Sequence, residues 1–107
     1  MNKAQMMDRV MGGEIFMVCE YRSSLAEAVT MRAPEAGRPA TFWRLTHNVE
    51  VGQGAMKVSE RVPDGANLEN YKSPFKKGTP VVCVVATILR DKAYNRVVNG
   101  VLEPLAV

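Results

Sequence analysis

The sequence has few of the residues that metal sites and catalytic sites usually need. It contains one histidine, His47, and two cysteines, Cys19 and Cys83, among 107 residues. Their wide spacing matches no zinc pattern, so we expect no bound metal and no other cofactor. Each cysteine lies in an apolar stretch, where a free thiol behaves as a small hydrophobic side chain. The sequence leaves open whether the two thiols lie close together in space.

Long apolar runs are also missing. No stretch approaches the roughly 18 apolar residues that a membrane span needs, and the first residues lack the apolar core and cleavage site of a signal peptide. We therefore expect a cytoplasmic protein with no membrane partner, in which a disulfide would be unusual. A chain of 107 residues is enough for one small domain, which would gain stability from oligomerisation.

Recognisable catalytic patterns are absent as well. On the strand expected at residues 41–51, alternation places His47 beside Trp43 and Leu45. That is the position of a core or rim imidazole more often than of a catalytic base. No paired carboxylates share a strand face, and the Gly52-Gln53-Gly54 turn does not lead into a helix as a phosphate-binding loop would. We therefore expect neither catalysis nor a small-molecule substrate.

Short alternating or apolar segments predict an all-β domain over residues 14–107. Residues 1–13 form an N-terminal extension, either a short helix ending at Gly12-Gly13 or an unstructured start. The first strand should bend at Ser23-Ser24, and residues 63–78 form the longest connection. Strands are expected at residues 14–22 (continuing over 27–32), 41–51, 55–62, 79–90 and 96–105. Five to six strands at this spacing indicate a small closed or partly open β-barrel with a long projecting hairpin.

The segment at 79–90 is apolar on both faces, as a central strand or a strand also buried between subunits would be. Positive charge gathers around it, because residues 71–96 hold six cations and one anion. A concentration of positive charge suits a polyanion such as nucleic acid. The alternative is a basic surface that only meets solvent.

Aromatic side chains lie among these cations. Phe42 stands beside Arg44 on the outward face of the strand at 41–51, and an exposed ring next to a cation can stack on a base while the cation meets a phosphate. Alternatively, Phe42 packs against the preceding loop. Tyr94 lies at the expected hairpin tip, and of the loop aromatics Tyr71 and Phe75 we expect one to close the end of the barrel. The candidate phosphate contacts are Arg38, Arg44, Lys76, Lys77, Arg90, Lys92 and Arg96.

The order of several short motifs resembles the single-stranded DNA-binding, or helix-destabilising, proteins of filamentous phages. The resemblance covers residues 32–104 and is one of spacing more than of identity. The matching pieces are Gly37-Arg38-Pro39, Val49-Glu50-Val51-Gly52, Val62-Pro63-Asp64-Gly65, Gly78 and Leu102-Glu103-Pro104. The resemblance implies an OB-like barrel, a homodimer formed partly through the long hairpin, and cooperative coating of single strands in a bacterial host cytoplasm.

The resemblance also implies roles for three residues. Arg38 sits where the family has a basic loop residue, Phe42 lies on the strand that contacts bases, and Tyr94 lies near the aromatic hairpin tip, where an ungapped comparison places Lys92. The chain departs from the family where tyrosines tend to occur, which leaves fewer rings for stacking. The departing residues are Ala40, Asn48 and Ala55.

Together these patterns predict a sequence-independent single-stranded DNA-binding protein with a basic, aromatic-lined groove. The sequence leaves RNA open as a ligand. The alternative is a small β-barrel module for protein–protein interaction, with the apolar strand residues 81–89 and the methionines as its contact surface.

Overall fold

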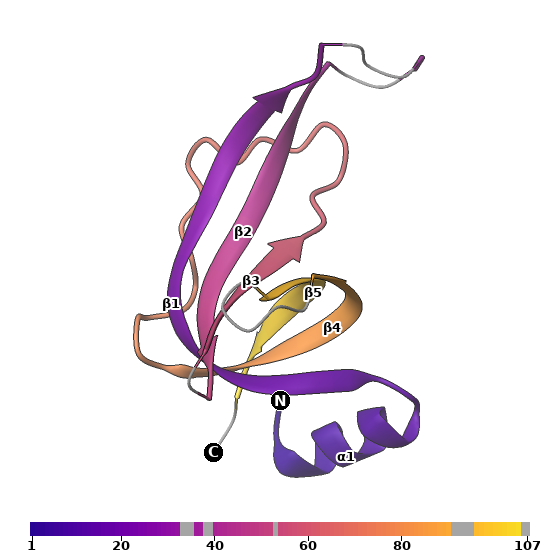
Figure 1. Ribbon diagram of the computed structural model, residues 1–107, viewed down its shortest axis with the longest axis vertical. Helices are drawn as coiled ribbons and strands as arrows, with labels where there is room; N and C mark the ends of the chain where they lie inside the picture. Colours follow the sequence, from indigo (N-terminus) through magenta and orange to yellow (C-terminus); the bar gives the residue numbers. More distant parts are fainter. Residues whose placement is uncertain (33–35, 38–39, 53, 91–95, 106–107) are drawn as a thin grey trace.

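The structure is a computed structural model that describes residues 1–32, 36–37, 40–52, 54–90 and 96–105. It is a small, mostly-β domain with one short N-terminal helix and five strands (Figure 1). The elements are α1 (Lys3–Met11), β1 (Ile15–Thr30), β2 (Thr41–Val51), β3 (Gly54–Glu60), β4 (Pro80–Arg90) and β5 (Arg96–Pro104). Of the two forms expected for the N-terminal extension, the helix is the one present, and it ends at Gly12.

The five strands form a mixed sheet that closes in a ring, in the order β1-β2-β3-β5-β4. All neighbours are antiparallel except β3 and β5, which run parallel. β1 closes the ring because it is long enough to pair with two strands. Its first part, Ile15 to Glu20, pairs with β4, and its later part pairs with β2 (Figure 1).

A β-bulge in β1 lies one residue before the bend that the sequence predicts at Ser23-Ser24. Tyr21 pairs with Val49 and Ser23 pairs with Asn48, so Arg22 is an extra residue in the ladder. A bulge of this kind bends a strand and redirects the side chain of the extra residue. Beyond it, the inward face of β1 continues with Ser24, which lies opposite His47.

The core fills the inside of the ring, and alternation identified most of it. Val49, Val58, Val81, Cys83 and Val98 are fully buried there. On β2 the expected inward face is confirmed, with Leu45, His47 and Val49 buried and Trp43 and Val51 half-buried. Ile15 is an exception: it alternates with the buried Cys19 and Tyr21, but it is 59% exposed at the start of β1.

β4 changes character along its length. Its first half is a central strand with Val81, Val82 and Cys83 buried, as its two apolar faces predict. Past Val85, β5 is its only strand partner among the described residues, and Ile88 and Leu89 are more than half exposed. β4 and β5 are antiparallel neighbours, and the tip of the long hairpin predicted between them lies outside the described residues.

The connection at residues 61–79 covers one side of the core. Phe75 packs against the core with its ring centroid 5.5 Å from that of Tyr21, so it is the aromatic that closes the ring. Tyr71 is half-buried beside it. Gly78 donates its backbone N–H to the Tyr21 carbonyl and fixes the end of the connection to β1.

Candidate nucleic-acid interface

The outward face of β2 presents a row of side chains that alternation predicts. Phe42 and Asn48 are half-buried on this row and Arg44 is exposed between them. The pairing of β2 with β3 sets Lys57 directly opposite Asn48, and Lys57 is exposed. A ring, two cations and an amide therefore lie on one face that spans two neighbouring strands.

Arg44 is held by an ion pair on this face. Its Nε and Nη2 atoms donate to Glu27 Oε1 of β1, at 3.0 and 2.7 Å. The two residues are direct cross-strand partners. The pair orients the guanidinium but offsets its charge, so Arg44 attracts a polyanion less strongly than the sequence suggested.

Apolar neighbours lie on the same face of β1. Val29 pairs with Phe42 and is half-buried, and Leu25 pairs with Thr46 and is 54% exposed. Phe42 thus has a cross-strand hydrophobic partner. The alternative prediction is that Phe42 packs against the loop before β2. That loop includes residues outside those described.

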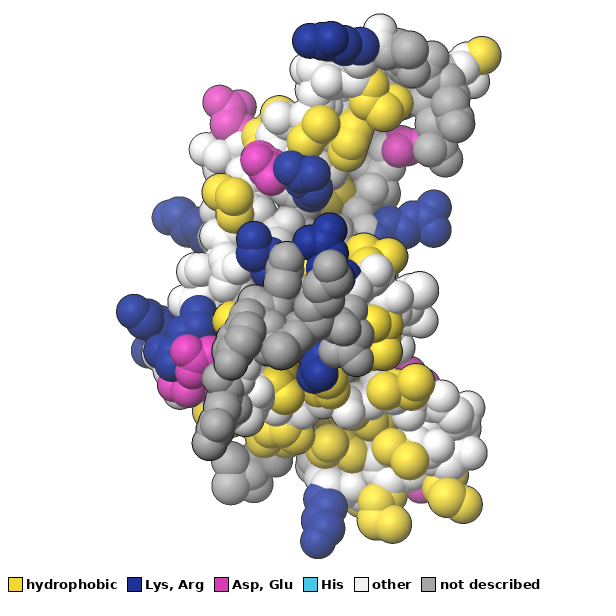
Figure 2. All heavy atoms as spheres, viewed as in Figure 1, with side chains coloured by type: hydrophobic (Ala, Val, Ile, Leu, Met, Phe, Trp, Pro, Cys, Tyr) yellow, Lys and Arg dark blue, Asp and Glu magenta, His cyan; other side chains and the backbone are white. Residues whose placement is uncertain are grey.

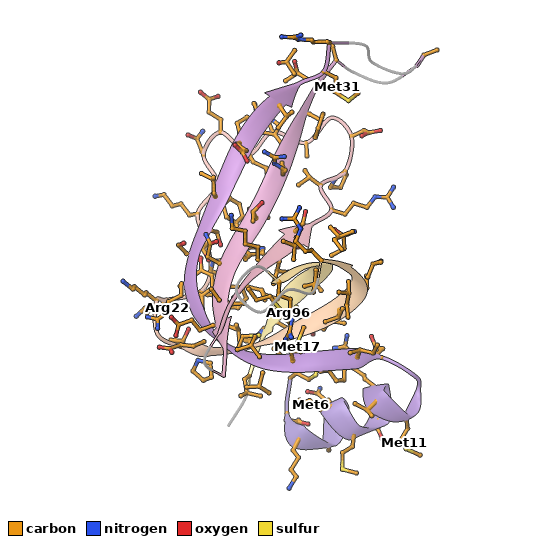
Figure 3. The ribbon with its side chains drawn as sticks, in the orientation of Figure 1. Met6, Met11, Met17, Arg22, Met31 and Arg96 are labelled. Carbon is orange, nitrogen blue, oxygen red and sulfur yellow. The ribbon has the colours of Figure 1, made fainter. Side chains whose placement is uncertain are left out.

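A second group of cations lies around a small hollow at the other end of this face. Arg22 from β1, Lys57 from β3 and Arg96 from β5 line it together with Asn48 and Glu50 from β2. Figure 3 shows Arg22 and Arg96 coming from different strands. Parallel pairing of β3 with β5 sets Arg96 opposite Met56 and brings it next to Lys57.

The remaining predicted cations are spread more widely. Lys76 and Lys77 are exposed in the connection at 61–79, just before Gly78 reaches β1, and Arg90 is exposed at the end of β4. The predicted contacts Arg38, Lys92 and Tyr94 lie outside the described residues. Figure 2 shows Lys and Arg side chains over the upper and middle parts of one face, and apolar side chains gathered in its lower half.

Arg22 and Lys57 are not among the binding residues that the sequence predicts. Lys57 could have been found, because it alternates with Met56 and Val58, whose side chains point inward. Arg22 could not, because its position depends on the bulge and on the approach of β3 and β5 in space.

A buried polar chain crosses the inside of the ring, and only the structure reveals it. Ser24 Oγ lies 2.6 Å from both the Tyr21 hydroxyl and His47 Nδ1, and His47 Nε2 lies 2.7 Å from Glu60 Oε2. His47 is 1% exposed, which confirms the expected core imidazole with satisfied hydrogen bonds.

Burial, followed by the nearby Glu60 charge, raises the pKa of Tyr71 beside this chain. A serine, a histidine and a carboxylate in series are the parts of a nucleophilic triad, but Ser24 is already bonded by Tyr21 and the imidazole is enclosed.

The cysteines are free and buried. Burial raises the pKa of Cys19 to about 11 and that of Cys83 to about 12. Among the described residues, no three His, Cys, Asp or Glu side chains are grouped so that they could hold a metal ion. In the same part of the chain, no helix has the length and apolar character to cross a membrane.

Comparison with known proteins finds no matching family model, no matching curated protein and no matching solved structure.

Proposed function

We propose that this protein binds unpaired nucleic acid, without base specificity and without catalysis, across the outward faces of β2 and β3. The observation that carries the proposal is that Phe42, Arg44 and Asn48 of β2 share one face with Lys57 of β3. Faces that combine cations with flat rings bind single strands by meeting phosphates and stacking on bases.

The ring order supports an OB-like barrel as the finer description of the fold. An OB fold is a five-stranded Greek-key barrel that binds oligonucleotides on the face of its strands 2 and 3 and through the loops between strands 1 and 2 and between strands 4 and 5. The candidate face lies on β2 and β3. Arg38 belongs to the first of these loops in sequence, and Lys92 and Tyr94 belong to the second. This agreement is also what supports a relationship with the filamentous-phage proteins.

A homodimer is part of the proposal. Among the described residues, the distal half of β4 pairs with β5 alone, and Ile88 and Leu89 are both more than half exposed. Exposed apolar side chains on an unpaired strand edge favour burial against a second copy. We place the protein in a cytoplasm, bacterial if a phage encodes it.

One observation favours protein interaction as a second candidate function. Met7, Val10 and Met11 of α1 and Ile15 and Val18 of β1 are each more than half exposed. Methionine-rich apolar surfaces accommodate varied protein partners. In this case the cations would be ordinary surface charges.

Fluorescence anisotropy of a labelled, mixed-sequence single-stranded DNA at several salt concentrations separates the two candidates. If about four phosphates are neutralised, the logarithm of the binding constant falls with the logarithm of salt with a slope near −3. Phe42→Ala removes a stacking surface worth about 1–3 kcal/mol per base. Lys57→Gln removes one cation from the face, and Lys3→Gln on α1 removes one elsewhere. Weakening by Phe42→Ala and Lys57→Gln, but not by Lys3→Gln, supports the proposal. No binding at low salt favours the protein-interaction module.

A further inference from the structure

The hollow beside Arg22 differs from the rest of the proposed face because it is a concave site with several donors. Its volume is about 140 Å³. Pockets for drug-sized organic ligands usually start at roughly 300 Å³. The hollow therefore suits a small group, such as a single phosphate, better than a base or an extended side chain.

The charges around the hollow favour an anion. Of the described side chains that line it, three are cationic, those of Arg22, Lys57 and Arg96, and one is a carboxylate, that of Glu50. The balance of these four groups is two positive charges. The cations come from β1, β3 and β5, so only the closed ring brings them together.

Arg22 provides the most specific observation. Its Nη2 atom donates to Glu50 Oε2 at 2.7 Å and lies 3.5 Å from Glu20 Oε2. Hydrogen bonding to Glu50 raises the pKa of the guanidinium, which keeps it charged. Its Nε atom is buried and has no hydrogen-bond partner among the described residues. Buried donors are nearly always paired in folded proteins, so one that is unpaired beside a hollow indicates a missing acceptor.

The bulge explains why Arg22 is placed in this way. Arg22 is the extra residue between Tyr21 and Ser23, and a bulge next to a binding site commonly re-aims one side chain. Glu20 and Glu50 pair directly across β1 and β2, where like charges repel. The Arg22 guanidinium bridges the two carboxylates through its Nη2 atom, which leaves its Nε–H without an acceptor among the described residues. Figure 3 shows Arg22 on the bent part of β1.

We infer that this hollow is a phosphate subsite, which holds one backbone phosphodiester of the bound strand through the Arg22 Nε–H and the charges of Lys57 and Arg96. The inference rests on the proposed function. It adds a fixed point to a face that otherwise contacts the strand without a defined register, because a guanidinium donates in a rigid, directed geometry.

The Arg22 Nε–H signal in a nitrogen–proton NMR spectrum reports the subsite directly. Titration with inorganic phosphate and with a short single-stranded oligonucleotide should shift this signal, whereas acetate should shift it much less. An equal response to acetate would overturn the assignment to phosphate. An unshifted signal with a strand that does bind would overturn the subsite and leave the proposed function intact.

Three variants separate directed hydrogen bonding from charge alone. Arg22→Lys keeps the charge and should lower oligonucleotide affinity about tenfold, because the Nε–H is lost, while the salt slope is unchanged. Glu50→Gln removes the competing carboxylate and should tighten binding more than Glu69→Gln, which makes the same charge change in the connection at 61–79. In the double variant Arg22→Gln and Glu50→Gln, Glu20 no longer faces a second carboxylate once Arg22 is gone. The slope of the logarithm of the binding constant against the logarithm of salt should become less steep by about 0.7.

Wild-type affinity in Arg22→Lys, or equal effects of Glu50→Gln and Glu69→Gln, would overturn the subsite. If the wild-type protein binds no strand but phosphate still shifts its Arg22 signal, the proposed function fails and the hollow binds a free anion instead.

Discussion

His47 Nε2 lies 2.7 Å from a carboxylate oxygen of Glu60 inside the ring. The two residues come from neighbouring strands, and His47 also contacts Ser24 through its other ring nitrogen. Burial of an imidazole costs little folding free energy when both of its nitrogens are hydrogen-bonded. If one partner is lost, a buried polar atom is left without a hydrogen bond, which destabilises the fold. This contact therefore stabilises the fold by allowing the only histidine to be part of the core.

Removal of the Glu60 carboxylate should destabilise the protein. Glu60→Ala leaves His47 Nε2 without its partner, and we expect a loss of about 1–3 kcal/mol in the free energy of unfolding. Urea denaturation measures it. Glu69→Ala removes an exposed carboxylate and should change stability by less than about 0.5 kcal/mol. Equal losses in the two variants would show that the Glu60 contact contributes nothing.

The cysteine thiols should resist alkylation in the folded protein. Burial raises the pKa of Cys19 to about 11 and that of Cys83 to about 12, so very little reactive thiolate exists near neutral pH. Treatment with iodoacetamide, followed by mass spectrometry, should find both thiols unmodified under native conditions. The unfolded chain in denaturant is the control and should react at both positions. Rapid modification of the native protein would contradict the buried positions.

The same pKa shift predicts a loss of stability at alkaline pH. The unfolded thiol of Cys83 ionises near its ordinary pKa of 9.0 and the folded one near 12, so the unfolded state loses its proton first. The contribution is complete below pH 9.0 and is lost as pH rises toward 12. Cys83→Ala should make the fall of unfolding free energy with pH shallower in this range. Its slope between about pH 6 and 8 should match that of the wild type; a difference there would point to another group.

Gly100 allows β5 to approach β4 closely. A Cβ atom at this position would lie 2.3 Å from the Val84 carbonyl oxygen, which belongs to backbone and cannot rotate away. Gly100→Ala should therefore cost about 1–3 kcal/mol or more through strain. Gly52 has φ +60° and open space around it. Gly52→Ala should therefore lower the free energy of unfolding by about 1 kcal/mol, the cost of a left-handed backbone conformation for alanine. Thermal denaturation compares the two variants, and a milder effect at Gly100 would contradict the close approach.

Arg9 attaches α1 to the sheet. Its guanidinium pairs with Glu14 at 2.7 Å and Glu103 at 2.8 Å, and lies 5.2 Å from the centre of the Phe16 ring. Arg9→Gln should speed amide hydrogen exchange throughout α1 and leave the strands unchanged. Lys3→Gln alters a charge on the same helix but keeps these contacts, so it should not speed exchange. Unchanged protection in Arg9→Gln would mean that other contacts hold the helix.

Much of the fold follows from local pattern. The β2 boundaries match the expected residues 41–51, because strict alternation and flanking turn residues define both ends. The bend in β1 was placed within one residue, since two serines interrupt an apolar run. The outward position of Phe42 and Arg44 follows from the same two-residue period.

Local pattern therefore specifies the strands, their faces and the concentration of cations in one part of the chain. Which strands pair depends on tertiary contacts, because β3 and β5 are far apart in sequence. That pairing brought Lys57 to Arg96, and the bulge brought Arg22 to both. Tertiary contacts also pair Arg44 with Glu27 and place His47 between Ser24 and Glu60. These relationships depend on strand register, which periodicity alone does not specify.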